Sequence, residues 1–587
     1  MKTLLIYSED ELQDEPWASQ RWDRVIDLGT TGAECYAEAE ATLGSPILRL
    51  SDFGKNFQGL LRLRELMAVG VGRLTDSLGL DWWELTAILF HQHLETAFLL
   101  RKLVESLSPC DEVHVTRPGF HADALRLVLG SRVQTFSTAV KSREGPVEHY
   151  ARLLRKFPVS QLIEIFWDKA DPGYQFRGSL RRRGRQSSNP VVLLPSSYVS
   201  ISRTALSYAQ TMPETRFLLV VTRRSGWIET SSSNVSAAWL SGYASLRDTA
   251  RKLERRDLVR RWELLRTELN TVPEIRSLDK LGYLRHFPRR ISQGLEIRDA
   301  WRNVLNQEAV QSVICADDSN PYTHIPLLLA AQRGLPTIAC HHGALDGRYF
   351  FKRNHADVVL AKGEMEKDYL VRLCGVSPDR VEIGAPLASS YSEQQMHQTS
   401  ANQKSAIIFF SEPHEMAGAR VKGFYRDILP RLADLTLAEG RELIIKLHPS
   451  ESLAERSRFV QQILNPKQRR IAQVIDGPLK PELLKNAWFG VAIMSTVVVE
   501  CALQQIPCFL CAWLDPWPYG YGDQFTRFDV GIPLREPAEI LKIPTILRGY
   551  HVSNTIRKNC WAPIQMQRLQ ALLGLSRDQP TTVGERN

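Results

Sequence analysis

The sequence predicts an α/β protein built on parallel sheets. Short apolar runs alternate with longer helical patterns along almost the whole chain, which is typical of strands joined by helical connections. The composition, with 43% hydrophobic and 24% charged residues, is that of a globular protein with ample material for buried cores. A length of 587 residues favours three or four domains.

The sequence also indicates the cellular compartment of the protein. The sequence has no uninterrupted apolar stretch of the roughly 18 residues that span a bilayer. Its start turns acidic at Glu9 and Asp10, which is not typical of a signal peptide. Among nine scattered cysteines, Cys508 and Cys511 lie in an apolar, strand-like run, which favours a buried structural role over a metal or redox site. We therefore expect a cytoplasmic protein.

The formal net charge of the chain is +9. A net positive charge suits an anionic ligand, an anionic lipid surface or nucleic acid, and it does not indicate which of these the protein binds. The Gly- and Ser-containing segment 176–188 is interpreted as a basic, solvated linker, with a membrane-surface or nucleic-acid patch as the alternative. Its basic cluster consists of Arg177, Arg181, Arg182, Arg183 and Arg185.

Residues 1–175 predict an N-terminal α/β domain. A mostly helical stretch over 57–107 separates its third and fourth strands. No motif in this block translates into chemistry, so its role is unknown at this stage. The expected strands are Thr3–Tyr7, Arg24–Leu28, Ile47–Leu50, Glu112–Thr116 and Val133–Phe136.

Residues 189–395 predict a second α/β domain. A helix is expected from about Ser202, and a charged helical region over 235–310. In that region an apolar stripe at spacings i, i+4 and i+7 is expected to face a core. The stripe consists of Leu258, Trp262 and Leu265. The expected strands are Val191–Pro195, Phe217–Val221, Ser312–Ala316, Pro336–Cys340, Val358–Ala361 and Val381–Ile383.

Residues 403–545 predict a third α/β domain, followed by a C-terminal helix and tail over 546–587. Helical patterns again lie between the apolar runs. The expected strands are Ser405–Phe410, Glu442–Leu447, Phe489–Ile493 and Cys508–Ala512.

Ligands of open parallel sheets bind outside the carboxyl ends of the strands, so the residues that come directly after each strand are informative. In the second domain, the strand that ends at Cys340 is followed by His341, His342 and Gly343. In the third domain, one strand is followed by His448 and another by Ser495 and Thr496. These polar clusters converge if the two sheets face each other.

The polar residues of the third domain are candidates for binding a phosphorylated nucleotide. Ser495 and Thr496 precede a helical run, where they either cap the helix or help its N-terminus to bind phosphate. Glu500 comes one turn later among apolar residues; it is either a surface residue or a carboxylate for ribose hydroxyls. His448 and Lys446 have the same strand parity, so both are expected on one face and near phosphate.

The histidines of the second domain are candidates for proton transfer. An imidazole titrates near neutrality, so His342 suits a general base that takes a proton from an acceptor hydroxyl. Gly343 allows a tight turn and close approach of a ligand. Whether His341 or His342 faces the cleft is open, and each histidine also has a purely structural interpretation.

Several segments between about 189 and 530 occur in an order that is fairly specific. They are Val313–Asp317, Leu327–Gly343, Ala356–Gly363, Gly384–Pro386, Lys446–Pro449, Ser495–Thr496 with Glu500, and Ile506–Pro507. Together they resemble bacterial surface and capsule polysaccharide transferases, including polysialyltransferase-like, Kdo-transferase-like and teichoic-acid polymerase-like proteins. The resemblance leaves out the first 175 residues.

The resemblance implies a fold and roles for residues. It implies a GT-B-like pair of facing Rossmann-like domains, with the N-terminal α/β domain in addition. His342 is similar to the acceptor base of those families, and His448, Ser495 and Thr496 are similar to their donor-phosphate residues. One departure is that three valines follow Thr496, where the family loop is more polar.

The resemblance also implies an activity. We expect an inverting, metal-independent glycosyltransferase that moves a sugar from a nucleotide-sugar donor to a surface glycan or glycolipid. A CMP-linked donor is favoured only by the resemblance. The adjacent Asp317 and Asp318 lack the spacing of an Asp-x-Asp metal pair, so Asp317 is expected to form a strand-end turn or line the cleft.

We expect no obligatory cofactor and no nucleic-acid partner, and the basic surface suits peripheral contact with the cytoplasmic face of the inner membrane. Two other classes stay open. One is an epimerase or hydrolase of nucleotide sugars on the same fold. The other is a non-catalytic glycan-binding or assembly protein.

Overall fold

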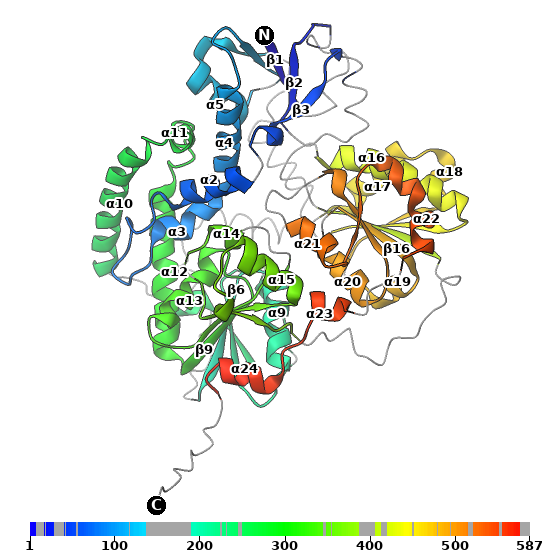
Figure 1. Cartoon of the computed structure of the whole chain (residues 1–587). Coiled ribbons are helices and arrows are strands. Elements are labelled where there is room, and N and C mark those ends of the chain that lie inside the picture. Colours follow the sequence, from blue (N-terminus) through cyan, green and yellow to red (C-terminus); the bar gives the residue numbers. More distant parts are fainter. Residues whose placement is uncertain are drawn as a thin grey trace, which may run out of the picture.

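A computed structural model of the chain contains three parallel sheets with helices between their strands (Figure 1). The structure describes residues 1–6, 17, 19–28, 40, 43–54, 57–116, 118–136, 189–223, 226–230, 232–244, 249–343, 348–353, 355–386, 405–412, 420–448, 451–477, 479–493, 495–514, 521–550 and 555–575. The predicted basic linker at 176–188 lies outside these ranges.

The first sheet has the strand order β3-β2-β1-β4-β5. All five strands predicted for residues 1–175 are confirmed, with ends that differ by about one residue. They are β1 Lys2–Ile6, β2 Arg24–Asp27, β3 Ile47–Arg49, β4 Glu112–Val115 and β5 Val133–Thr135. The helices of this part are α2 Phe57–Ala68, α3 Trp82–Ala87, α4 His91–Glu105 and α5 Phe120–Leu129.

The second sheet has the strand order β12-β11-β10-β9-β6-β7-β8. Its strands are β6 Val191–Ser196, β7 Phe217–Val221, β8 Val235–Trp239, β9 Val310–Cys315, β10 Thr337–Ala339, β11 Val358–Ala361 and β12 Val381–Ile383. Helix α9 Val199–Gln210 begins three residues before the predicted start, and α13 Pro321–Ala331 and α15 Glu364–Asp368 follow later strands.

One prediction for this region was wrong. Residues 235–239 were expected to open a helical region, but they form β8, an edge strand paired in parallel with β7. Its Ser and Ala residues carry little strand propensity, so pairing with β7 decides the conformation. The helical region starts later, with α10 Thr249–Leu269, α11 Pro273–Lys280 and α12 Phe287–Gln307.

These long helices pack against the helices that follow β3. Trp262 is buried and its ring stacks on Trp83 of α3, with ring centroids 6.2 Å apart. Leu258 and Leu265 are also buried, so the predicted core-facing stripe is confirmed. A Cβ placed at Gly294 of α12 would lie 2.0 Å from the Trp82 ring, so only glycine allows this close approach.

A buried ion network joins the same two groups of helices. Arg298 of α12 donates to Asp76, which lies in the loop between α2 and α3, at 2.8 Å. It also donates to Glu254 of α10 and to its neighbour Asp299, each at 2.8 Å. The Arg298 side chain is 2% exposed, so one guanidinium is surrounded by three carboxylates away from water.

The third sheet has the order β15-β14-β13-β16-β17-β18. Its strands are β13 Ala406–Phe410, β14 Glu442–Lys446, β15 Ala472–Ile475, β16 Ala487–Ala492, β17 Cys508–Cys511 and β18 Ile532–Leu534. Its helices are α16 Arg420–Ala438, α17 Leu453–Ile463, α18 Pro466–Arg469, α19 Pro481–Lys485, α20 Val497–Leu503, α21 Tyr521–Arg527 and α22 Ile543–Arg548.

The four strands predicted for the third sheet are confirmed, and Cys508 and Cys511 are buried in β17 as expected. The edge strands β15 and β18 were missed. Both are short; the exposed Gln473 interrupts the apolar run of β15, and Pro533 makes β18 unlike a central strand.

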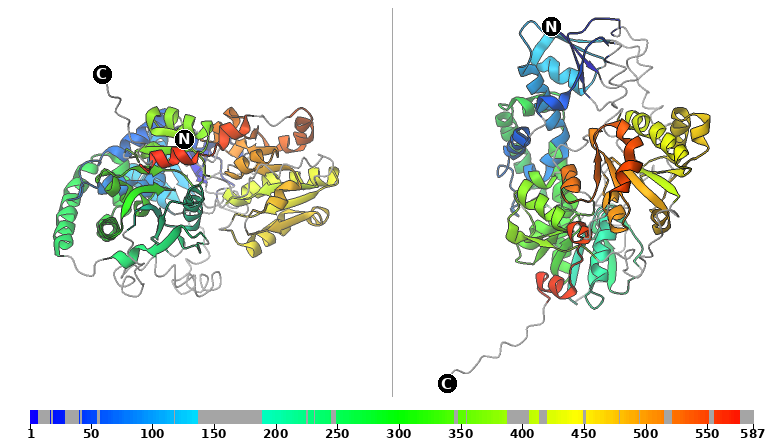
Figure 2. Two further views of the ribbon diagram at one scale, coloured as in Figure 1. Left: turned by 90° about the horizontal axis from the view of Figure 1, so that it is seen from below. Right: turned by 45° about the vertical axis from the view of Figure 1, so that its right-hand side comes forward.

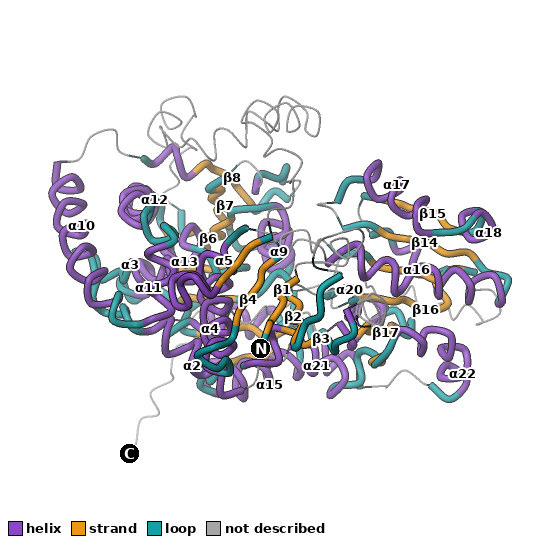
Figure 3. Tube along the Cα trace, turned by 90° about the horizontal axis from the view of Figure 1, so that it is seen from above, coloured by secondary structure: helices purple, strands orange, loops and turns teal. Residues whose placement is uncertain are grey.

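The three strand orders are alike. Each sheet begins at a central strand, extends to one side through its second and third strands, and continues on the other side from its fourth. This is the order of doubly wound, Rossmann-like sheets. The predicted architecture, two facing Rossmann-like domains and an additional N-terminal α/β domain, is confirmed. Seen from above, β6–β8 and β14–β16 form two separate groups (Figure 3).

The last described segment returns to the second sheet. After α23 Ile556–Cys560, the chain pairs with residues that follow β12, where Ala385 donates a backbone hydrogen bond to Ala562 at 2.8 Å. Helix α24 Met566–Leu572 then packs on that sheet through Leu569 (Figures 1 and 2). The domain limits predicted at 395, 403 and 545 stay predictions. Among the described residues, no helix is long and apolar enough to span a bilayer.

Candidate functional site

A cluster of four side chains lies at the carboxyl edge of the second sheet. Asp317 follows β9, His341 and His342 follow β10, and Tyr198 follows β6. These strands are neighbours in the order β10-β9-β6, so their carboxyl ends meet at one edge. We call these four residues the Asp317 cluster.

Asp317 is the centre of the cluster. Its Oδ2 atom accepts a hydrogen bond from the Tyr198 hydroxyl at 2.5 Å and lies 3.6 Å from Nδ1 of His342. Its Oδ1 atom accepts a hydrogen bond from the backbone N–H of Ser319 at 2.7 Å. The carboxylate therefore forms the strand-end turn that the sequence predicted and also contacts the candidate base.

The charge state of Asp317 depends on its surroundings. Burial opposes ionisation of the carboxyl group, but the positive charges of His341, His342 and Lys352 outweigh it and hold the pKa of Asp317 below its ordinary value. The side chain is 1% exposed. A buried anion therefore faces the histidines near neutral pH.

The two histidines differ in their surroundings. His341 is buried, and its Nδ1 accepts a hydrogen bond from the backbone N–H of Gly343 at 3.2 Å. His342 is the more accessible, with 19% of its side chain exposed, and its Nε2 lies 3.4 Å from the Tyr198 hydroxyl. The imidazole of His342 is therefore the better placed to meet a substrate.

The turn after β10 is held in place from the next strand. Lys362, which follows β11, donates a hydrogen bond from Nζ to the carbonyl of Gly343 at 3.0 Å. A Cβ built on Gly343 meets no described atom within 4 Å, so the space beside this turn is open among the described residues. That space suits the close ligand approach predicted for the glycine.

The same cluster can also offer ligands to a cation. Asp317, His341 and His342 each have one ligand atom within 4.8 Å of the others. One carboxylate and two imidazoles are a ligand set that first-row transition metals and zinc accept. The expectation that no metal is required therefore stays a prediction.

On the third sheet, Lys446 ends β14 and is buried. Its ammonium donates hydrogen bonds to the carbonyls of Leu447 and Gly477, each at 2.7 Å, and so connects the ends of β14 and β15. Burial lowers the pKa of Lys446, while the negative charges of Asp476, Glu451 and Glu500 oppose this effect. Lys446 and Glu500 are thus electrostatic neighbours.

His448 is exposed at the same edge. Its backbone N–H donates to Glu451 Oε2 at 2.9 Å. The other oxygen of Glu451 accepts hydrogen bonds from Ser411, which follows β13, and from the buried Arg456 of α17, each at 2.8 Å. Glu451 therefore fixes the turn that carries His448.

Ser495 and Thr496 lie between β16 and α20. The Ser495 hydroxyl accepts a hydrogen bond from the backbone N–H of Val497 at 3.3 Å. Thr496 occupies the N-cap position but makes no side-chain capping bond, so the predicted capping role falls to Ser495. Glu500 is the one residue of α20 that is not buried. Because β14, β13 and β16 are neighbours, these residues share an edge with His448.

Tyr198, Ser411 and Glu451 were not predicted from the sequence. Two of them carried a usable signal, because Tyr198 comes shortly after the expected strand 191–195 and Ser411 comes directly after 405–410. Their places at strand ends could have identified both. Glu451 comes after a proline in a loop, and only the structure shows its contacts with Arg456 and His448.

The chain resembles solved structures in fold, although no family model matches it and no curated protein matches it in sequence. Among solved structures, it is similar to UDP-GlcNAc 2-epimerase from Methanocaldococcus jannaschii, with 12% identity and a TM-score of 0.41 over 66% of this chain and 99% of that one.

Two further solved structures are similar. MurG from Acinetobacter baumannii has 10% identity and a TM-score of 0.38 over 66% of this chain and 99% of that one. The wall teichoic acid polymerase TagF has 12% identity and a TM-score of 0.37 over 73% of this chain and 98% of that one. Likeness at this level does not bear on the reaction.

Proposed function

We propose that the chain is a glycosyltransferase that moves a sugar from a nucleotide-activated donor to a glycan or glycolipid acceptor. The observation that carries the proposal is the contact of Asp317 with His342 at the carboxyl edge of the second sheet. A buried carboxylate beside an accessible imidazole is an arrangement that supports general-base catalysis.

His342 is the proposed base. Its Nε2 takes the proton of an acceptor hydroxyl while the hydroxyl oxygen forms a bond to the anomeric carbon of the donor sugar. The bond from that carbon to the donor phosphate breaks, and the electron pair leaves with the nucleotide. Attack opposite the leaving group inverts the anomeric centre. Asp317 stabilises the imidazolium that forms, because its charge lies 3.6 Å from Nδ1.

The third sheet is the proposed donor side. His448, Ser495 and Thr496 donate hydrogen bonds to the donor phosphate, and Glu500 accepts hydrogen bonds from ribose hydroxyls. Lys446 keeps the strand ends together and adds positive charge close to Glu500. A CMP-linked donor is supported by the sequence resemblance alone.

The possible ligand set in the Asp317 cluster favours one alternative, a hydrolase of nucleotide sugars that uses a divalent cation. We propose instead that the reaction needs no metal. Treatment with a chelator distinguishes the two, because it leaves the rate of donor consumption unchanged in a metal-independent transferase and abolishes it in the metal-dependent hydrolase.

The donor site is tested by thermal unfolding with CMP, CDP, UDP, GDP and ADP, for the wild type and His448→Ala. A nucleotide that binds the folded state contributes about 2.7 kcal/mol at a hundredfold excess over its dissociation constant. One nucleotide should raise the melting temperature of the wild type and lose most of that effect in the variant. If none does so at millimolar concentration, the donor-site assignment is wrong.

A further inference from the structure

Three side chains of the Asp317 cluster are placed like the ligands of one cation. Oδ2 of Asp317 and Nδ1 of His342 are 3.6 Å apart. Two ligand atoms at about 2.1 Å from one tetrahedral Zn²⁺ ion are about 3.4 Å apart, so a cation between these atoms needs little movement of either side chain. The ligand atom of His341 lies within 4.8 Å of both, and a shift of about 1.4 Å or less brings it into the same shell.

The ligand side chains are oriented by hydrogen bonds of their own. Oδ1 of Asp317 accepts the backbone N–H of Ser319 at 2.7 Å, and Oδ2 accepts the Tyr198 hydroxyl at 2.5 Å. A carboxylate oxygen has a second lone pair, so these bonds leave it able to bind a cation. Nδ1 of His341 lies 3.0 Å from the carbonyl oxygen of Gly343. When Nδ1 donates to that carbonyl, the lone pair of the ring is on Nε2, as is usual in a histidine that binds a metal.

The charge around the cluster favours a cation. Lys352 is paired with the buried Asp318 at 2.5 Å. Lys362 is paired with Glu366 at 2.8 Å. These two ammonium groups and two carboxylates balance, and the carboxylate of Asp317 adds one negative charge. With neutral imidazoles, the cluster is therefore an anionic site, and a divalent cation gains Coulomb energy there.

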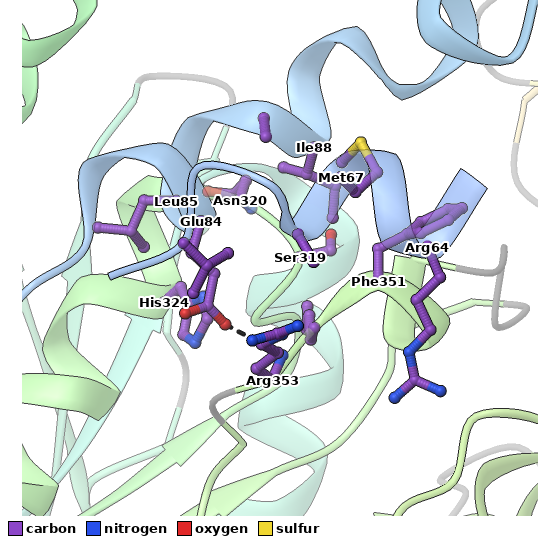
Figure 4. Close-up of a pocket in the computed structure, with 14 residues that line it drawn as sticks. Arg64, Met67, Glu84, Leu85, Ile88, Ser319, Asn320, His324, Phe351 and Arg353 are labelled. Atoms are coloured by element: carbon purple, nitrogen blue, oxygen red, sulfur yellow. Dashed lines mark hydrogen bonds between the residues drawn. The ribbon is translucent and has the colours of Figure 1, made fainter. Parts of the chain in front are cut away.

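The loop after β9 is held in place, while the cluster stays accessible. Ser319 and Asn320 of this loop line a small cavity together with Met67 of α2 and Ile88, which follows α3 (Figure 4). The side chain of Asn320 also caps α13. The loop is thus fixed between the N-terminal helices and the second sheet. His342 keeps 19% of its side chain exposed, so an ion can enter from solvent.

A cation on Nδ1 would change what His342 can do. A neutral imidazole has one N–H group and one nitrogen with a lone pair. If a cation takes the lone pair of Nδ1, the proton is on Nε2, and Nε2 cannot accept another proton from an acceptor hydroxyl. The cation also binds the carboxylate of Asp317, which otherwise stabilises the imidazolium. A bound cation therefore removes both parts of the proposed general base.

We propose that Asp317, His341 and His342 bind Zn²⁺, and that the bound ion inhibits the transferase by holding His342 in the tautomer that is not a base. Zinc suits this set because its tetrahedral shell accepts imidazole nitrogen and carboxylate oxygen, and a water completes the shell. The site rests on the ligand geometry, whereas the inhibition rests on the proposed function. The ion is regulatory, and the reaction proceeds without it.

The site is tested by calorimetric titration of the metal-free full chain with zinc chloride. The wild type should bind one Zn²⁺ ion that Asp317→Asn and His342→Gln each bind at least about tenfold more weakly. His448→Ala, which removes an exposed histidine at the third sheet, is the control and should bind zinc as the wild type does. Thermal unfolding without zinc shows whether each variant is folded. No zinc binding by the wild type, or equal binding by both cluster variants, overturns the proposal.

The tautomer is tested by nitrogen NMR of the full chain with labelled histidine rings, and His342→Gln identifies the signals of His342. Zinc should shift these signals to those of a ring with a metal on Nδ1 and a proton on Nε2. A chelator should reverse the shift. If Nε2 of His342 carries no proton in the zinc-bound chain, the proposed inhibition is wrong.

The failure of this inference is distinguishable from failure of the proposed function. Zinc should lower donor consumption and a chelator should restore it, whereas stimulation by zinc overturns the inhibition and supports the metal-dependent hydrolase. Nucleotide binding without zinc binding overturns the cation site alone. Zinc binding in the cluster without nucleotide binding overturns the donor site and leaves the cation site supported.

Discussion

Oδ2 of Asp317 lies 3.6 Å from Nδ1 of His342, and the carboxylate is almost completely buried. The pair comes from two neighbouring strands, β9 and β10, so the sheet itself sets the distance. Because Tyr198 also donates a hydrogen bond to this oxygen, the carboxylate has a fixed position toward the imidazole.

Asp317→Asn should lower kcat about a hundredfold or more, because the imidazolium that forms during proton transfer loses its counter-charge. The KM for the donor should stay close to that of the wild type, since the proposed donor site is on the other sheet. Steady-state nucleotide release with acceptor present measures both. Asp379→Asn, an exposed carboxylate of the same domain, is the control. A change in KM alone would contradict the positioning role.

Lys446 and His448 lie two positions apart but should behave differently. Lys446→Met leaves two carbonyl groups without their ammonium donor, so it should lower the free energy of unfolding by about 1–3 kcal/mol. His448→Ala should leave stability unchanged, because the imidazole is exposed. Denaturant unfolding measures the stability of both variants. Nucleotide binding, which His448→Ala should weaken, is measured separately. Equal stability of both variants would show that the ammonium is not structural.

The ion network of α10 and α12 should make stability depend on pH. Burial opposes ionisation of Glu254, but hydrogen bonds from Arg298 and Ser77 lower its pKa to about 2, against an ordinary value of 4.5. The contribution of Glu254 to the free energy of unfolding is fully present above pH 4.5 and is lost as the pH falls toward 2. Glu254→Gln should flatten that part of the curve of unfolding free energy against pH. An unchanged slope would contradict the network's role.

Gly363 is expected to tolerate no side chain. A Cβ at this position would lie 2.4 Å from the carbonyl oxygen of Asn559 in the returning C-terminal segment. Gly363→Ala should therefore lower the free energy of unfolding by about 1–3 kcal/mol through forced backbone displacement. Gly343→Ala, which meets no described atom within 4 Å, is the control for stability. The same melting temperature for both variants would exclude the close approach.

Much of the fold could be predicted because central parallel strands are apolar throughout. Residues 217–221 and 406–410 are buried at every position, and both were found as strands. The edge strands β8, β15 and β18 were not found, because Ser236 and Gln473 interrupt the apolar runs of β8 and β15, and β18 is three residues long and contains Pro533. These segments become strands because they pair with a neighbouring strand, and the local sequence pattern does not reveal that pairing.

The candidate site could be predicted only in part for a related reason. Asp317, His342 and His448 could be located from their positions after strands, because parallel strands place their carboxyl ends at one edge. Position in the chain does not indicate that Lys446 donates to Gly477 at the next strand end. Nor does it indicate that Met67 and Ser319 line one cavity, because they are far apart in the chain and carry no shared pattern.

The return of the C-terminal segment has a consequence for synthesis. Ile564, Leu569 and Leu573 belong to the buried cluster on one face of the second sheet. They come after the whole third sheet in the chain, so a ribosome makes them after that sheet. During translation, one apolar face of the second sheet stays uncovered until these residues are synthesised. All strands of the third sheet have been synthesised before that point. The order in which the domains finish folding is therefore not the order in which they emerge.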